Sequence, residues 1–73
     1  MARVDVKSEV TGTVWKIESG VGASVGQSDP VIVIESMKME IPVVAATSGT
    51  VAEVLVGEGD MVSEGDVVAR IDA

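Results

Sequence analysis

The sequence predicts an all-β domain, a sandwich or flattened barrel, and three observations lead to it. Apolar residues make up 47% of the 73 residues and are largely Val and Ile, with Trp15 as the single aromatic. Such β-branched side chains pack well on pleated surfaces. The chain contains an internal repeat, described below. Its apolar runs are short and end at Gly- and Asp-bearing turns, and no window keeps a helical period free of Gly or Pro. We therefore expect one domain over residues 1–73, with essentially no helix.

The repeat relates residues 11–35 to residues 48–72 at a constant offset of 37, without a gap. Glycines and aspartates recur in register with the apolar residues, so composition alone does not explain the match. Nine of the 25 pairs are identical: Gly12/Gly49, Thr13/Thr50, Val14/Val51, Gly20/Gly57, Gly22/Gly59, Val25/Val62, Asp29/Asp66, Val31/Val68 and Ile34/Ile71.

Each half has the pattern of a β unit. A turn at Gly12 opens an apolar-rich run through Ser19, and the glycines of residues 20–22 end that run. A short segment, a polar turn and a buried apolar run follow, and the second half repeats the series. The remaining expected segments are the turns 27–30, 57–60 and 64–66 and the strand-like runs 24–25, 31–34, 41–45, 61–62 and 67–71. Such short strands between turns are typical of a sandwich or barrel.

Neither half is large enough to bury a face alone, so we expect the two to face each other around one shared core with pseudo-two-fold symmetry. Trp15 aligns with Ala52, and we expect a large side chain in one half to be matched by a small one in the other. Lys38 aligns with position 1. It should therefore lie at one end of the domain, with the two chain termini near the opposite end. Pro42 should lie near a strand end or on an edge strand, where its missing N–H costs little.

Composition excludes several classes of function. Without cysteine the chain forms no disulfide, and without histidine it lacks the common zinc ligands and any His- or Cys-based catalytic pair. The formal net charge is −7, from 5 Lys and Arg against 12 Asp and Glu, which repels nucleic acid and favours a monomer in solution. No apolar stretch is long enough to cross a membrane, and residues 1–5 lack signal-peptide organisation. We expect a cytoplasmic protein that is not an enzyme, with no nucleic-acid or membrane partner.

Two further patterns have plainer interpretations. The glycine-rich residues 20–26 resemble a phosphate-binding loop, but that motif requires a helix after it, and the repeat places acidic residues 57–60 at the same position. Both segments are interpreted as turns. The acidic side chains of Asp60, Glu64 and Asp66 match no defined calcium loop, so a solvated acidic face is favoured and no metal site is expected.

The turn between the two halves breaks the rules that the other turns follow. Residues 35–40 separate two strand-like runs, and a tight hairpin favours Gly, Asn or Asp at its centre. Met37 and Lys38 occupy the bend instead. A lysine at such a position is usually only solvated, and the flanking Met37 and Met39 could fold back onto the core. The missing turn residues, the paired methionines and the position between the repeats together favour a functional role, because methionine offers an adaptable recognition surface.

These residues carry a resemblance. Ser36-Met37-Lys38-Met39, preceded by Ile34-Glu35, resembles the Ala-Met-Lys-Met signature of biotinyl domains, in which the lysine carries biotin in amide linkage. The likeness covers almost the whole chain. It includes the Gly-Thr-Val segments that begin at Gly12 and Gly49, together with Gly57, Val62 and Gly65. Short biotin/lipoyl attachment proteins are the most similar members.

The resemblance implies a flattened β-barrel, or barrel–sandwich hybrid, of two quasi-symmetric four-stranded sheets with the lysine on a hairpin tip. It implies covalent biotin on Lys38, with Glu35, Ser36, Met37, Met39 and Glu40 as contacts for a biotin protein ligase. A free lysine amine is protonated at neutral pH, so the ligase must supply the activated biotin and remove the proton. The carrier would then shuttle carboxyl groups between biotin carboxylase and carboxyltransferase components.

Two alternatives remain open at this point. Biotinyl domains usually have Ala where this chain has Ser36, and Glu-Ser before the lysine is more typical of lipoyl domains, so lipoate, or both cofactors, at Lys38 is the second hypothesis. The third is an unmodified interaction module that keeps the same fold. The ungapped repeat leaves no room for the protruding thumb of some carboxyl carriers, and no Ala/Pro-rich linker precedes it. Both features favour a stand-alone carrier.

Overall fold

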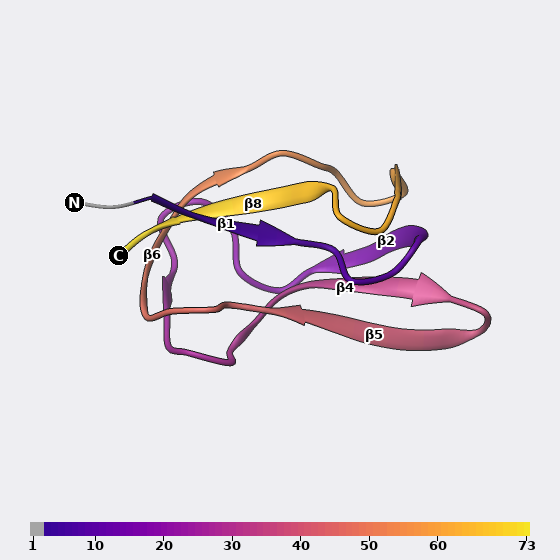
Figure 1. Ribbon diagram of the computed structural model, residues 1–73, viewed down its shortest axis with the longest axis horizontal. Helices are drawn as coiled ribbons and strands as arrows, with labels where there is room; N and C mark the ends of the chain where they lie inside the picture. The colour runs from indigo at the N-terminus through magenta and orange to yellow at the C-terminus, as the bar shows by residue number, and fades with distance from the viewer. Residues whose placement is uncertain (1–2) are drawn as a thin grey trace.

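The computed structural model describes residues 3–73 as eight β-strands without a helix, as the sequence predicts. The molecule measures 36 × 17 × 16 Å along its principal axes, and the strands run largely along the long axis (Figure 1). Residues 3–73 accordingly include no helix of the length and apolarity needed to cross a membrane. The strands are β1 (Arg3–Lys7), β2 (Gly12–Ile17), β3 (Ser24–Val25), β4 (Pro30–Ser36), β5 (Met39–Val44), β6 (Gly49–Val54), β7 (Met61–Val62) and β8 (Val67–Asp72).

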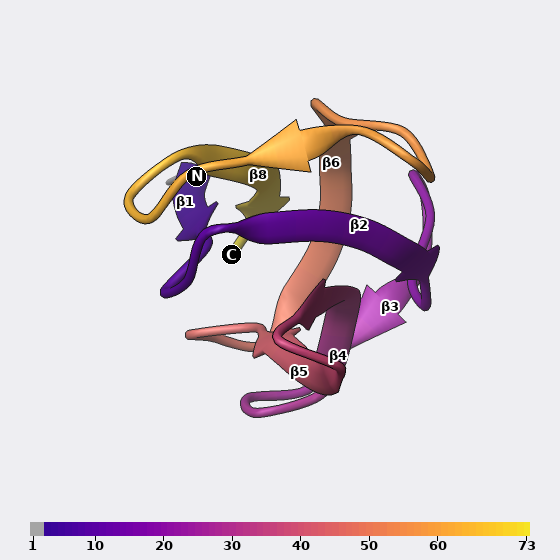
Figure 2. The same cartoon turned by 90° about the vertical axis from the view of Figure 1, so that its right-hand side faces the viewer.

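The strands form two antiparallel four-stranded sheets, β1-β8-β6-β3 and β5-β4-β2-β7 (Figure 2). The offset of 37 converts β1 into β5, β2 into β6, β3 into β7 and β4 into β8, so it converts one sheet into the other. Each sheet therefore takes strands from both halves of the chain. This arrangement confirms the predicted pair of quasi-symmetric sheets. In the described residues the two sheets do not join into a closed barrel, and they form a flattened sandwich.

Strand β1 is the one element that the sequence patterns did not predict. Val4 and Val6 alternate with charged residues there, which is the period-two pattern of a half-buried strand. The repeat also extends to it, because β1 and β5 are equivalent and Val6 and Val43 are buried at matching positions. A five-residue segment with two apolar residues is a weak signal alone. Its pairing with β8 supplies the stabilisation.

The expectation that Trp15 and Ala52 would balance each other in the core is wrong. The register of β2 against β4 shifts between Val14 and Lys16, and that of β6 against β8 shifts between Val51 and Glu53. Trp15 and Ala52 are therefore the extra residues of two equivalent β-bulges. Trp15 is 48% exposed, so the core places no limit on its size.

The core lies between the sheets and consists of aliphatic side chains from both halves. Ile32, Ile34, Ile71, Val31 and Val68 are completely buried. The one buried polar side chain in the described chain, Ser8, donates its hydroxyl to the carbonyl oxygen of Val10 at 2.6 Å. The remaining buried apolar residues are Val6, Val14, Val25, Val43, Ala45, Val51, Val62 and Ala69.

The repeated aspartates close equivalent turns. The carboxylate of Asp29 accepts a hydrogen bond from the backbone N–H of Gly26, and that of Asp66 accepts one from Ser63, each at 2.8 Å. Asp60 closes a further turn by accepting from the N–H of Gly57 at 2.7 Å. These carboxylates are therefore structural, and residues 3–73 hold no cluster of acidic side chains suited to a metal ion.

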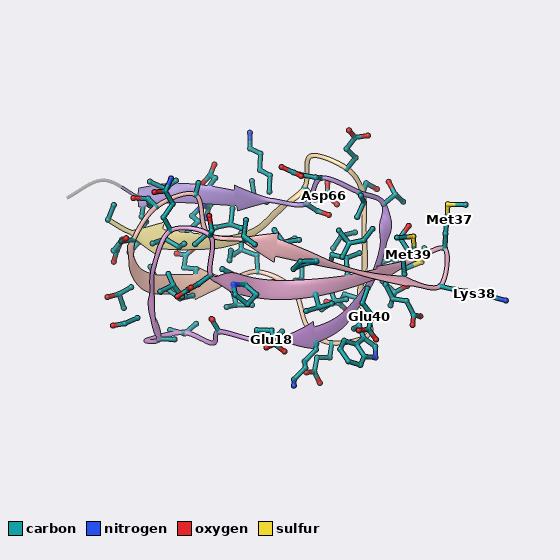
Figure 3. The ribbon with its side chains drawn as sticks, turned by 90° about the horizontal axis from the view of Figure 1, so that it is seen from below. Glu18, Met37, Lys38, Met39, Glu40 and Asp66 are labelled. Atoms are coloured by element: carbon teal, nitrogen blue, oxygen red, sulfur yellow. The ribbon has the colours of Figure 1, made fainter. Side chains whose placement is uncertain are left out.

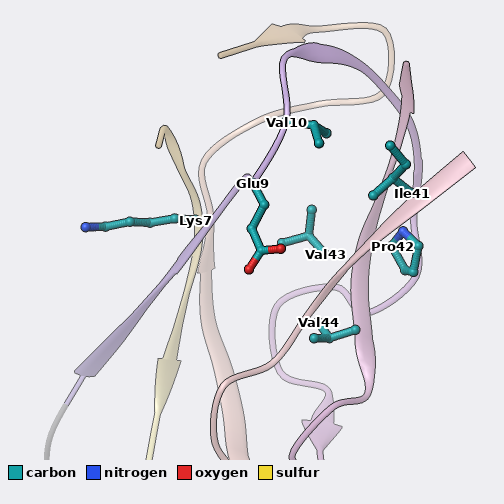
Figure 4. Close-up of a pocket in the computed structure, with 7 residues that line it drawn as sticks. All are labelled: Lys7, Glu9, Val10, Ile41, Pro42, Val43 and Val44. Carbon is teal, nitrogen blue, oxygen red and sulfur yellow. The ribbon is translucent and has the colours of Figure 1, made fainter. Parts of the chain in front are cut away.

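The β4–β5 hairpin projects at one end of the long axis, whereas the C-terminus and the start of β1 lie at the other end (Figure 1). This confirms the predicted opposition of residue 38 and the C-terminus, whereas the N-terminal residues 1–2 lie outside the described residues. Pro42 lies in β5, an edge strand of its sheet, as expected. A small groove lies between β5 and the end of β1, where the sandwich stays open (Figure 4). Val10, Ile41 and Val43 line it, and the Lys7 side chain points away from it.

Two glycines permit the close approach of strands that the fold requires. A Cβ atom at Gly12 would overlap the carbonyl oxygen of Glu35 and would lie 2.8 Å from Cγ2 of Ile34. At Gly49 it would overlap the carbonyl oxygen of Asp72 and lie 2.8 Å from Cγ2 of Ile71. A backbone oxygen cannot rotate away as a side chain can, so these two members of the repeat must be glycine.

We expect Gly12→Ala to lower the free energy of unfolding by about 2 kcal/mol, within the range for overpacking a tight site. Gly20→Ala is the matched control, because a Cβ there would meet nothing within 4 Å. Urea unfolding followed by circular dichroism measures both variants. Equal stability of the two would show that the approach of β2 to β4 does not depend on Gly12.

Candidate functional site

The tip of the β4–β5 hairpin is a two-residue turn. Ser36 pairs with Met39 as the last pair of the ladder, which leaves Met37 and Lys38 as the loop. Their φ angles are +52° and +64°, so both residues are left-handed. Positive φ at both central positions is what a type I′ turn requires, and this turn matches the right-handed twist of the flanking strands.

This turn is built from residues that suit it poorly. The left-handed region costs an ordinary L-residue roughly 1 kcal/mol or more, and it is why Asn-Gly dominates type I′ turns. In the two turns of the repeat near residues 22 and 59, glycine occupies the positive-φ position, and Ser28 is the one further non-glycine residue with positive φ among the described residues. The presence of Met and Lys at the tip therefore costs backbone strain. Strain of this kind persists at functional sites when the surrounding structure holds it in place.

The side chains at the tip are directed into solvent. Met37 is 92% exposed and Met39 is 63% exposed, so neither folds back onto the core. The Lys38 side chain points away from the domain beyond the end of the hairpin (Figure 3). Within residues 3–73 no carboxylate oxygen lies within 4.0 Å of its Nζ. The fold makes no use of the lysine amine.

The base of the hairpin is tied to two neighbouring loops. The Ser36 hydroxyl donates to the carbonyl oxygen of Thr11 at 3.0 Å, and the Thr11 hydroxyl accepts from the N–H of Glu64 at 3.1 Å. Ser36 therefore has a role inside the domain. Glu35 and Glu40 are cross-strand partners with exposed side chains, one pair below Ser36 and Met39.

All six residues singled out by the sequence lie together because they belong to one hairpin. The sequence patterns missed the side chains that other strands bring to the same face. Glu35 is the cross-strand partner of Thr13, and Thr13 is the partner of Met61, which is 79% exposed. Register across a sheet determines this row. The one available signal was the offset of 37, which places Met61 where the first half has Ser24.

A stiff two-layer scaffold with one projecting lysine is the architecture of a domain that presents a side chain to other proteins. Comparison with known proteins agrees. The family described as "Biotin-requiring enzyme" matches residues 4–71. The "Biotin/lipoyl attachment protein" of Bacillus subtilis is 44% identical over 66 residues, which cover 90% of each chain. The "Biotinylated protein TB7.3 homolog" of Mycobacterium leprae is 40% identical over 67 residues, covering 92% of this chain and 94% of the relative.

A solved structure leads to the same result. The urea carboxylase of Kluyveromyces lactis superposes with a TM-score of 0.93 and 44% sequence identity, over 99% of this chain and 6% of that protein. The chain belongs to the family of biotin and lipoyl attachment domains.

We expect Met37→Asn to raise the free energy of unfolding by about 1 kcal/mol, because asparagine tolerates positive φ better than methionine. Met39→Asn is the control, since Met39 lies in a strand and asparagine is a poor strand former. Thermal unfolding of both variants gives the comparison. If Met37→Asn were no more stable than the parent, the turn would hold no strain that asparagine relieves.

Proposed function

We propose that the protein is a biotin carrier in which the Nζ atom of Lys38 is the attachment point. The observation that carries this proposal is the strained turn at the end of the long axis. It holds a lysine that forms no ion pair within residues 3–73, between two exposed methionines. The family and the biotin-linked names of its relatives support biotin as the cofactor. The protein is a carrier rather than a catalyst.

Attachment forms one amide bond between Nζ and the biotin carboxyl carbon. The lysine amine attacks biotinyl-adenylate in a biotin protein ligase, the acyl–phosphate bond breaks, AMP leaves with the bonding electrons, and a base of the ligase takes the amine proton. The residues of this domain place the amine. The turn fixes the direction of Lys38, and Met37, Met39, Glu35, Ser36 and Glu40 form the surroundings that the ligase contacts.

The bound cofactor supplies a nitrogen that accepts a carboxyl group and passes it on. Relatives of this chain include pyruvate carboxylases, and the structure superposes on part of a urea carboxylase. We propose that the partners are a biotin carboxylase and a carboxyltransferase. A tether on a rigid domain 36 Å long raises the effective concentration of the cofactor at both enzymes. Ligation and carboxylation both use ATP, so we propose that the protein lies in the cytoplasm. The net charge of −7 supports a monomer.

Lipoate on Lys38 is the second candidate, favoured by Ser36 and by the name of the Bacillus subtilis relative, a biotin/lipoyl attachment protein. The hydrogen bond from Ser36 to Thr11 gives this serine a structural role, which lessens its weight as a sign of lipoate. Biotin is therefore the preferred cofactor.

Intact mass of the protein, co-expressed with biotin protein ligase and with lipoate ligase, tests the proposal. We expect one biotinyl adduct on the parent chain and none on Lys38→Arg, because the guanidinium keeps the charge but does not form the amide. Lys16→Arg should keep the adduct. We expect Lys38→Arg to change the unfolding free energy by less than about 0.5 kcal/mol. An adduct that survives Lys38→Arg would refute the site, and a lipoyl mass alone would refute biotin.

A further inference from the structure

The two-fold symmetry provides an internal comparison between the outer faces of the two sheets. Positions related by the offset of 37 have the same backbone surroundings. The outer face next to the tip, called here the lysine-side face, includes Trp15, Val33, Glu35, Glu40, Pro42 and Met61. The equivalent positions of the other sheet form the mirror face: Ala52, Arg70, Asp72, Arg3, Asp5 and Ser24.

The charged side chains of the mirror face form ion pairs with one another and with Glu53. Arg3 bonds Asp72 at 2.9 Å and Glu53 at 3.0 Å. Arg70 bonds Glu53 at 2.9 Å and Asp5 at 3.1 Å. The hydrogen bond to Asp72 raises the pKa of Arg3 above its ordinary value, and the hydrogen bond to Glu53 does the same for Arg70. Every charged group in this network faces a partner of opposite sign.

In the described residues, the glutamates of the lysine-side face form no such ion pairs. Glu40 and Glu35 are directly opposite each other where the mirror face pairs Arg3 with Asp72. Like charges at directly opposite positions destabilise a sheet. In the described chain neither glutamate has a basic nitrogen within 4.0 Å, and the nearby Lys16 is paired with Glu18 at 3.3 Å.

The same face also exposes large apolar side chains. Trp15 is 48% exposed and Met61 is 79% exposed, where the mirror face has Ala52 and Ser24. Pro42 and Val33 replace the paired Asp5 and Arg70. Because the mirror positions carry a charged surface on the same backbone, folding does not require this apolar and acidic one. Exposed apolar groups of this kind mark interaction sites.

The size of the face identifies which partner covers it. Trp15 lies at the level of Val33, five residues from Lys38, which is about 17 Å at ~3.3 Å per residue. A lysine side chain is short, so the enzyme that modifies it must close around the tip. A standard interface of about 800 Å² per partner is roughly 32 Å across, so an interface over this face has room for both the tip and Trp15. Carboxylating enzymes meet the longer cofactor arm and have no need to cover this face.

We propose that the lysine-side face is the docking surface for the biotin protein ligase, with basic ligase side chains opposite Glu35 and Glu40 and an apolar recess for Trp15. This inference rests on the proposed function and deepens it. It predicts that the domain is recognised from one sheet only, although the two sheets share one architecture. Charge complementarity sets the encounter rate, and the buried aromatic anchor sets the affinity.

The test exchanges residues between the two faces. Trp15→Ala with Met61→Ser gives the lysine-side face the residues that the mirror face has, and the matched control is Ala52→Trp with Ser24→Met. Purified biotin protein ligase is assayed for initial rates against carrier concentration. We expect the first pair to raise KM at least about tenfold with kcat within about twofold, as for loss of an interface anchor. The control should change neither. Circular dichroism confirms that both pairs fold.

A second arm tests the charge. Glu40→Arg gives this face the residue of Arg3, which should raise KM and weaken its dependence on salt, because screening acts on the lost attraction. Equal KM values for the parent and the lysine-side pair would overturn the inference, as would equal losses on both faces. A lysine-side pair that is biotinylated normally but fails as a substrate of biotin carboxylase would assign the face to that enzyme and also overturn it. Absence of any adduct on the parent chain would instead refute the proposed function.

Discussion

The structure depends on strand exchange between the two halves of the chain. Strand β8 of the second half pairs with β1 of the first, and β4 of the first half pairs with β5 of the second. Neither half contains a complete sheet, so each supplies the partner that the other needs to bury its aliphatic face. The closest strand contacts lie within each half, at Gly12 between β2 and β4 and at Gly49 between β6 and β8, where a side chain would not fit. A domain of 73 residues without disulfides obtains a rigid core in this way.

The position of the lysine follows from that exchange. The segment that joins the halves connects β4 to its antiparallel neighbour β5. It therefore forms a hairpin at the end of the domain opposite the C-terminus. Six registered pairs between β4 and β5 hold this hairpin, and Ser36 ties its base to Thr11. The rigid base tolerates two left-handed residues at the turn. At this end of the domain the strain falls on Met37 and Lys38 alone.

Symmetry also separates what folding requires from what recognition requires. The buried positions agree between the halves, as Val6 and Val43 or Ile34 and Ile71 show. The outer positions diverge, as Arg3 and Glu40 or Ala52 and Trp15 show. Both bulges and both sheets are kept while the surfaces differ. Under the proposed docking, stability constrains both faces, whereas contact with the ligase constrains one.

The sequence by itself determined the all-β class and the unusual turn, because both follow from local pattern. It also determined the two-fold relation and the position of Lys38 at one end of the domain, because both follow from a repeat of fixed offset. Only the tertiary structure decided that β1 is a strand, that Trp15 lies outside the core, and that Met61 lies in the same cross-strand row as Glu35. Those facts depend on register between strands far apart in the chain, and one shift in pairing moves a side chain to the other face. The lysine was evident from its neighbours in sequence, whereas the surface around it is assembled by pairing.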